Sequence, residues 1–156
     1  MINLNCINYS ARGVTLLIRT LTENDYKEVT RLTLQLGYPS KQEIIENRIR
    51  RLLNEKDNQV FVYEGDGCLL GWVHVFGKLL IELEYAEIGG LIVDQNYRQG
   101  GIGSKLMRKS EEWAKENGYK EIRLRSGGQR LIAHDFYKRI GYKNTNSQQL
   151  FVKSFK

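Results

Sequence analysis

The residues best suited to chemistry form one short stretch, Arg98-Gln99-Gly100-Gly101-Ile102-Gly103-Ser104. This stretch follows an apolar run that ends at Val93, and a helix-like pattern begins within it at Ile102. Glycines let a bulky ligand approach the backbone, and the first turn of a helix carries amide N–H groups without intrahelical acceptors. The positive end of the helix dipole adds to the attraction of an anion. The stretch therefore predicts a cradle for a phosphate or pyrophosphate group.

Two common nucleotide-binding motifs do not describe this stretch. The dinucleotide pattern G-x-G-x-x-G, started at Gly101, would place Leu106 where the third glycine belongs. A Walker loop is excluded as well, because no Gly-Lys-Ser/Thr follows a spaced glycine. What remains is the pattern R-x-x-G-x-G, formed by Arg98, Gly101 and Gly103.

Apolar periodicity and turn residues predict the elements that position this loop. We expect strands over residues 14–19, 59–63, 68–76, 88–93, 120–125, 142–143 and 150–155, and helices over 26–36, 43–53, 102–117 and 130–140. The pair Asp66-Gly67 indicates a hairpin between the second and third strands. Gly89 and Gly90 inside an apolar strand suggest a bulge or a close approach of a ligand. Strand, loop, helix and strand from residue 88 to 125 form a right-handed crossover, so those two strands should be parallel.

Length and composition fit one globular domain over residues 1–156, with residues 1–13 as a loose lead-in. No apolar stretch approaches the roughly 18 residues of a membrane helix, and no secretory signal is evident, so we expect a cytoplasmic protein without a membrane partner. Cys6 and Cys68 are expected to be free thiols. The net charge of +6 could attract nucleic acid or an acidic ligand. The arginines of residues 48–51 lack interleaved aromatic residues, which favours a solvated helix face over nucleic-acid binding.

The loop resembles the acyl-CoA pyrophosphate loop of the GCN5-related N-acetyltransferase (GNAT) superfamily. Two further sequence motifs add to the resemblance. One is Ala86-Glu87-Ile88, and the other is the segment 133–142 with its A-x-x-F-Y-x-x-x-G-Y pattern. The element order matches the superfamily from residue 14 to 155. The resemblance implies an α/β (α+β) fold whose mixed central sheet of about six to seven strands contains a splayed parallel pair and is flanked by about four helices.

The resemblance also implies that acetyl-CoA is the co-substrate, and because no histidine, cysteine and carboxylate grouping has metal-site spacing we expect no metal. In the superfamily, the backbone of the central strand binds the pantetheine arm and the acyl carbonyl, and the glycine loop binds the pyrophosphate. Carried over to this sequence, the cofactor-binding residues are Leu91, Ile92, Val93, Arg98, Gln99, Gly100, Gly101, Ile102, Gly103, Ser104, Ser126 and Arg130. Ser126 and Arg130 stand near the place where family members often carry an asparagine, and either could replace it.

Two residues match catalytic positions of the superfamily. Tyr137 matches the tyrosine that donates a proton to the CoA sulfur, although a packed core tyrosine is the alternative. Glu87 matches the general base of histone-type members, with an exposed or ion-paired carboxylate as the alternative. Glu82 and Glu84 are reserves for the same role.

The two histidines carry weaker signals. His134 shares helical spacing with Arg130 and Lys138, which favours a solvated or loop-contacting side chain. His74 alternates with Val73 and Val75 in a strand, and the sequence leaves open whether it faces an acceptor cleft. No grouping of histidine, cysteine and carboxylates has metal-site spacing.

The sequence thus predicts an N-acetyltransferase that moves an acetyl group from acetyl-CoA to a primary amine of a small molecule, within a ternary complex. A non-catalytic acyl-CoA sensor and a protein or peptide N-acetyltransferase are the alternatives. No nucleic-acid partner is expected, and the sequence leaves homodimer formation open.

Overall fold

The computed structural model describes residues 16–65 and 67–156. The chain divides into two compact units, residues 1–125 and 126–156, and each unit is described by itself. The expected lead-in over residues 1–13 and residue Asp66 of the expected hairpin turn lie outside the described residues. So does the expected start of the first strand at residues 14–15.

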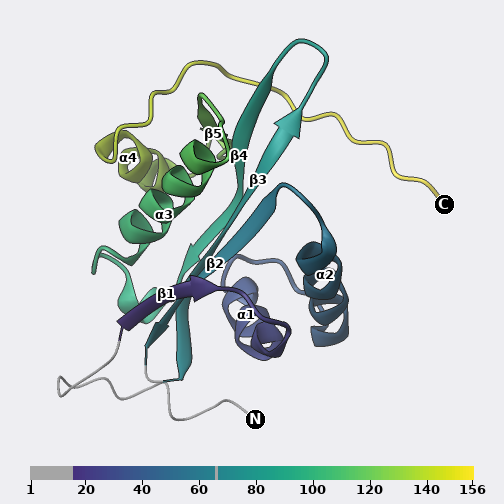
Figure 1. Ribbon diagram of the computed structural model, residues 1–156, viewed down its shortest axis with the longest axis vertical. Coiled ribbons are helices and arrows are strands. Elements are labelled where there is room, and N and C mark those ends of the chain that lie inside the picture. The colour runs from purple at the N-terminus through teal and green to yellow at the C-terminus, as the bar shows by residue number, and fades with distance from the viewer. Residues whose placement is uncertain (1–15, 66) are drawn as a thin grey trace. The chain divides into compact units, whose positions relative to one another are not determined.

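The first unit is built on a five-stranded sheet with the order β1-β2-β3-β4-β5 (Figure 1). The strands are β1 (Leu16–Thr20), β2 (Asn58–Gly65), β3 (Cys68–Leu79), β4 (Glu84–Val93) and β5 (Ile122–Leu124). Neighbouring strands are antiparallel except β4 and β5, which are parallel. The parallel pair confirms the crossover that the strand-loop-helix-strand pattern predicts.

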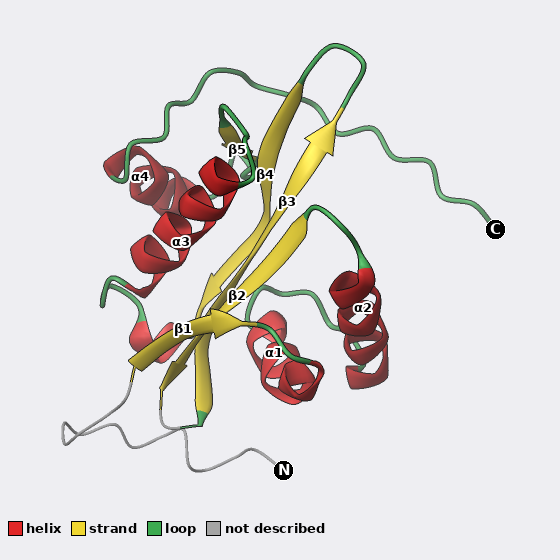
Figure 2. Cartoon of the chain, in the orientation of Figure 1, coloured by secondary structure: helices red, strands yellow, loops and turns green. Residues whose placement is uncertain are grey.

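Helices cover both faces of this sheet (Figure 2). On one face lie α1 (Tyr26–Leu34) and α2 (Gln42–Asn54), and on the other lies α3 (Ile102–Glu116). The core beneath α1 and α2 consists of apolar side chains from the helices and the sheet: Leu21, Val29, Leu32, Ile45, Ile49, Val60, Val62, Leu69 and Ile92. Each helix is amphipathic, and burial of its apolar stripe against the sheet is what holds it in place.

Gly71 in β3 shows how closely α3 packs on its face. A Cβ atom at this position would lie 2.7 Å from the Ile92 carbonyl oxygen and 3.2 Å from a methyl carbon of Leu106. Only glycine allows this approach of helix and sheet, and the approach fixes where the first turn of α3 begins.

The second unit contains α4 (Leu131–Arg139), which ends before Gly141 in a left-handed conformation with φ of +103°. Four α-helices therefore form, as expected. Residues 142–156 carry neither helix nor strand, so the strands expected at 142–143 and 150–155 are absent from the part of the chain described. The described sheet has five strands instead of six to seven. Strand-like alternation alone cannot form a strand, because a strand requires a hydrogen-bonding neighbour.

Cys68 is buried at the start of β3 and is disulfide-bonded, so the expectation of a free thiol at this position is wrong. Sequence spacing carries no information on which cysteines approach each other in space. Within the described residues, no helix combines the length and apolarity needed to cross a membrane.

Candidate functional site

The glycine loop leads directly into the N-terminus of α3. Gly101 is the N-cap residue, with φ of +79° and ψ of 4°, a left-handed conformation that favours glycine. Arg98, Gln99, Gly100 and Gly101 are all exposed, whereas Ile102 is buried and anchors the first turn. An exposed backbone turn that ends at the N-terminus of a 15-residue helix can bind an anion through its amide groups.

Asp94 anchors the start of this loop. Its side chain is 3% exposed and accepts hydrogen bonds from the Asn96 amide at 3.0 Å and from Arg31 Nη1 at 2.6 Å. Burial alone would raise the pKa of Asp94, but the bonds from Asn96 and Arg31 outweigh it and lower the pKa. Arg31 lies in α1 and also donates to the Leu69 carbonyl oxygen at 2.8 Å. The loop is therefore tied to α1 and β3 through one buried ion pair.

Two further contacts hold the loop against its surroundings. The Gln95 amide donates to Gln35 Oε1 at 3.0 Å, and Arg98 Nε donates to the Val93 carbonyl oxygen at 3.2 Å. The second bond folds the Arg98 side chain back toward the end of β4. These two bonds attach the loop to α1 and to the end of β4.

The edge of β4 is only partly covered by β5. Parallel pairing extends from Ala86 to Ile88 in β4, opposite Ile122 to Leu124 in β5. Leu91, Ile92 and Val93 lie beyond this pairing, and the glycine loop follows them within a few residues. Backbone N–H and C=O groups along such an uncovered strand edge can bind an extended ligand by strand-like hydrogen bonds.

A bulge interrupts β4 just before this edge. His74 of β3 pairs with Gly90, and Val75 pairs with Ile88, which leaves Gly89 as the extra residue of β4. This confirms the bulge that the Gly89-Gly90 pair suggests from the sequence. Gly89 is exposed, whereas the four residues before it are buried. The bulge thus marks the point where β4 changes from a covered strand to an open one.

Glu87 lies on the covered part of β4 and is 8% exposed. Lys78 Nζ donates to its Oε2 at 3.2 Å, and Arg125 donates to its Oε1. Burial alone would raise the pKa of Glu87, but the hydrogen bonds and charges of Arg125 and Lys78 outweigh it and lower the pKa. Glu87 is thus an ion-paired carboxylate, and its affinity for a proton is weakened. Both reserve residues, Glu82 and Glu84, are exposed.

The second unit carries three predicted site residues and His134. Tyr137 is half-buried in α4, with ring centroids 5.2 Å from Phe136 and 6.1 Å from Tyr142. Burial raises the pKa of Tyr137, so its hydroxyl keeps the proton at neutral pH.

Ser126 and Arg130 precede α4. The Ser126 hydroxyl is buried and has no hydrogen-bond partner among the described residues, and Arg130 is exposed at the N-cap position. His134 Nε2 lies 2.9 Å from the Gly127 carbonyl oxygen, so this histidine contacts the loop before α4.

The structure thus brings Leu91–Val93 and the loop 98–104 together at one end of β4, with Glu87 further back along the strand. Tyr137, Ser126 and Arg130 belong to the second unit. Sequence reasoning missed Asp94, Arg31 and the cations that hold Glu87. The only local signal was the position of Asp94 directly after an apolar strand, because its partner lies 63 residues away.

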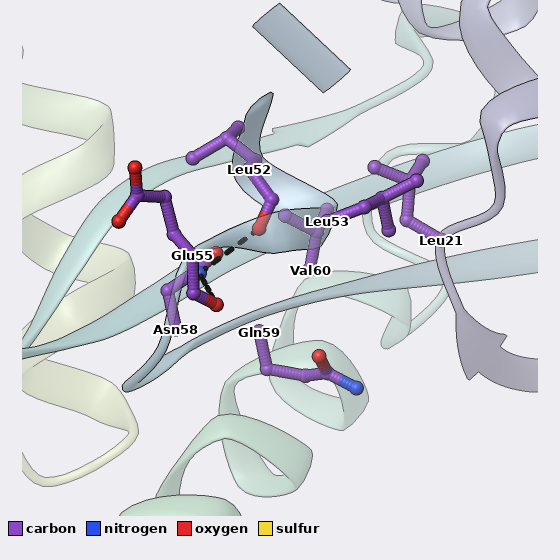
Figure 3. A pocket seen from close by; sticks show the side chains of 7 residues that line it. All are labelled: Leu21, Leu52, Leu53, Glu55, Asn58, Gln59 and Val60. Carbon is purple, nitrogen blue, oxygen red and sulfur yellow. Dashed lines mark hydrogen bonds between the residues drawn. The ribbon is translucent and has the colours of Figure 1, made fainter. Parts of the chain in front are cut away.

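A cavity of about 120 Å³ lies elsewhere in the first unit, where α2 leads into β2 (Figure 3). Asn58 bridges its wall by donating to the carbonyl oxygens of Leu52 at 3.1 Å and Glu55 at 3.0 Å. No predicted site residue lines this cavity. Among residues 16–65 and 67–156, no three side chains of histidine, cysteine or carboxylate type are grouped to hold a metal ion.

Comparison with known proteins places these features in a family. The model of the acetyltransferase (GNAT) family matches residues 22–142. An uncharacterised N-acetyltransferase of Methanocaldococcus jannaschii is 28% identical over 138 residues, which cover 83% of this chain. The chain spans 61% of that relative's length.

Solved structures show the same fold. The aminoglycoside N-acetyltransferase AAC(6′)-Iy in complex with CoA matches with a TM-score of 0.82 and 17% identity, over 93% of this chain and 99% of that one. A second structure of AAC(6′)-Iy holds the bisubstrate analogue CoA-S-monomethyl-acetylneamine; it matches with a TM-score of 0.80 and 16% identity, over 90% and 99% of the two chains. At these identities the likeness shows the fold alone.

Proposed function

The chain belongs to the acetyltransferase (GNAT) family, and we propose that it moves an acetyl group from acetyl-CoA to a primary amine of a small molecule. The transfer is direct, within a ternary complex, and no covalent acyl-enzyme forms. One acetyltransferase domain spans residues 1–156 in this proposal. Membership of the family makes the chain an acyltransferase, and the identities of the acetyl donor and of the amine acceptor are what we propose.

The single observation that carries the proposal is the uncovered edge of β4 next to the glycine loop. The pantetheine arm of acetyl-CoA would lie along Leu91, Ile92 and Val93, where pairing with β5 has ended. Its pyrophosphate would lie at the N-terminus of α3, whose N-cap residue is Gly101. One extended, anionic ligand accounts for both features, whereas a free phosphate would need only the loop.

Acyl transfer to an amine requires stabilisation of a developing oxyanion and a proton for the leaving thiolate. Backbone N–H groups of the β4 edge serve the first need. Tyr137 serves the second, because its raised pKa keeps the hydroxyl protonated until the thiolate leaves. Ser126 and Arg130 would contact the pantetheine arm in place of the usual asparagine.

The acceptor is proposed to be a cationic small molecule. Glu82 and Glu84 are exposed near the start of β4 and carry negative charge. AAC(6′)-Iy is an aminoglycoside acetyltransferase and binds an acetylneamine analogue, which supports an amine acceptor of this class. A protein or peptide amine is the second acceptor class, and a non-catalytic acyl-CoA sensor is the alternative to an enzyme.

An amine panel tests the proposal. Purified protein is incubated with acetyl-CoA and aminoglycosides, polyamines, amino acids or peptides, and the release of free thiol is measured. We expect thiol release with at least one small-molecule amine, and a raised unfolding midpoint with acetyl-CoA. Turnover only with peptides would refute the small-molecule acceptor. Stabilisation by acetyl-CoA without any turnover would favour the sensor, and stabilisation by DNA alone would refute the donor as well.

A further inference from the structure

We propose that His74 is the general base of this reaction and takes the proton that the acceptor nitrogen loses as its bond to the acetyl carbon forms. The inference deepens the proposed function and rests on it. It assigns to a residue of β3 the role that the sequence assigned to Glu87 of β4. Four observations carry it: the register of His74, the glycines beside it, its unpartnered ring nitrogen and the pairing of Glu87.

The register of β3 on β4 brings His74 to the donor site. His74 pairs with Gly90, the residue before Leu91, at the bulge where β4 becomes uncovered. Neighbouring strands lie about 4.8 Å apart, and successive residues advance by about 3.3 Å. His74 therefore lies opposite the residue that directly precedes the strand segment proposed to bind the acetyl carbonyl.

The glycines of the bulge let the imidazole lean over β4. A Cβ atom at Gly89 would lie 3.1 Å from His74 Nδ1 and 3.0 Å from a ring carbon of Phe76. A Cβ atom at Gly90 would lie 3.0 Å from ring carbons of Trp72. The rings of Trp72, His74 and Phe76 thus occupy the space that side chains at the two glycines would fill. Gly89 itself is exposed, so these rings border the surface of the sheet at this point.

The ring nitrogen Nε2 of His74 makes no hydrogen bond to a described residue that would explain its place in the fold. His74 Nε2 is buried and has no hydrogen-bond partner within the described part of the chain. A buried polar atom without a partner costs free energy, and such atoms call for a functional reason. The ring contact with Phe76, at a centroid distance of 5.3 Å, supports the orientation of the imidazole but leaves its nitrogens unused.

Within residues 16–65 and 67–156, no charged group shifts the pKa of His74. Burial is the sole cause that lowers the pKa of His74 below 6.5, so the imidazole is neutral at pH 7. Beside it, β2 presents Val60 as its direct partner. The helices above this face contribute apolar residues to the core: Val29, Leu32, Ile45 and Ile49. The charged side chains of α1 and of the strands around this face are paired with one another: Arg19 with Asp25 and Glu64, Arg31 with Glu28 and Asp94, and Lys78 and Arg125 with Glu87.

The charged side chains around Glu87 form ion pairs and hydrogen bonds with one another. Lys78 and Arg125 both bond to Glu87, and Arg125 Nη2 lies 3.5 Å from the Tyr85 hydroxyl. Glu87, with a pKa below 4.5, accepts protons more weakly than an imidazole. Glu87 thus positions the two cations on the covered half of β4, and His74 is the better base on the open half.

The proton and bond changes balance in a single transfer. The neutral amine attacks the thioester carbon, a C–N bond forms as the π electrons of the C=O bond pass to oxygen, and the nitrogen becomes positively charged; the C=O bond forms again when the C–S bond breaks. His74 Nε2 takes one proton from this nitrogen. The C–S bond then breaks with its electrons passing to sulfur, and the thiolate takes a proton from Tyr137. The products are the amide and free CoA, and solvent returns the proton from His74 to Tyr137.

The test compares His74→Gln and His74→Ala with wild type, using an amine found in the panel and His134→Gln as the matched control. General-base catalysis contributes about 10²–10⁴-fold, so we expect kcat to fall by about 10²-fold or more in both His74 variants. The KM for acetyl-CoA should change by less than about twofold, since the imidazole acts on the acceptor nitrogen. Imidazole added to His74→Ala should restore turnover in proportion to its neutral fraction. His134→Gln should keep the wild-type rate.

The pH dependence of kcat in wild type separates the two candidate bases without any variant. A base must be deprotonated, so the rate rises with pH through the pKa of the base. The acid limb expected for His74 lies below the ordinary imidazole value of 6.5, and a limb that lies wholly below 4.5 would indicate Glu87. The chain has two histidines, so its imidazole NMR signals can be followed directly, and we expect acetyl-CoA to shift the signal of His74.

The outcomes separate failure of this proposal from failure of the proposed function. Unchanged kcat in folded His74→Gln, or an unshifted His74 signal in protein saturated with acetyl-CoA, would overturn the base assignment alone. If the His74 variants do not fold, the wild-type pH profile and NMR titration still decide. Absence of any acetyl-CoA binding or turnover in wild type would overturn both.

Discussion

Replacement of Asp94 by asparagine should weaken both the fold and the donor site, because this carboxylate joins the glycine loop to α1. Removing one partner of a buried ion pair costs about 3–5 kcal/mol. Here Arg31 is 27% exposed and keeps its bonds to Glu28 and the Leu69 carbonyl oxygen, and the new amide can still accept from Asn96. We therefore expect a loss of about 2 kcal/mol. In a chain of this length that loss lowers Tm by about 4–8 °C.

The same substitution should reduce binding of acetyl-CoA. If the displaced loop raises Kd tenfold, the stabilisation that a saturating ligand provides falls by about 1.4 kcal/mol. The ligand-induced rise in Tm then shrinks by about 3–6 °C. Differential scanning fluorimetry with and without acetyl-CoA measures both effects on one sample.

Asp25→Asn provides the matched control. Asp25 is also buried; it accepts from Arg19 at 2.8 and 2.9 Å and from the Thr22 amide at 2.8 Å, at the start of α1. We expect Asp25→Asn to lower Tm by a similar amount and to keep the full stabilisation by acetyl-CoA. An equal loss of ligand stabilisation in both variants, or none in Asp94→Asn, would refute the reasoning.

The pH dependence follows from the lowered pKa of Asp94. A carboxylate whose folded pKa lies below its ordinary value of 3.8 contributes stability above that value and loses it as pH falls through the folded pKa. The difference in unfolding free energy between wild type and Asp94→Asn should therefore be constant near neutral pH. It should shrink below about pH 3.8.

Two further substitutions test the remaining site residues. Tyr137→Phe should lower kcat by about 10²-fold and leave the thermal shift with acetyl-CoA intact, since only the proton donor is lost; unchanged turnover would remove Tyr137 from the mechanism. Glu87→Gln should cost about 1 kcal/mol, because Lys78 and Arg125 are partly exposed and can turn to solvent. If it abolishes the acid limb of kcat instead, the base is Glu87 and not His74.

Much of the fold was predictable because its signals are local. The bulge at Gly89 follows from the residues of one strand, and the parallel crossover from β4 to β5 follows from one continuous strand-loop-helix-strand pattern. The strands predicted at 142–143 and 150–155 do not form, because these residues have no partner strand in the described part of the chain. A local pattern predicts a conformation, whereas a strand also needs a neighbour.

The sequence by itself determined the loop, the strand before it, the family and the identity of the residues that match its motifs. The tertiary structure decided what those residues contact. Arg31 reaches Asp94 across 63 positions, and Arg125 reaches Glu87 across 38, so neither pairing has a local signature. His74 acquires its place only through the register of β3 on β4. The protonation of a carboxylate or an imidazole depends on such neighbours and on burial, and both are properties of the folded chain.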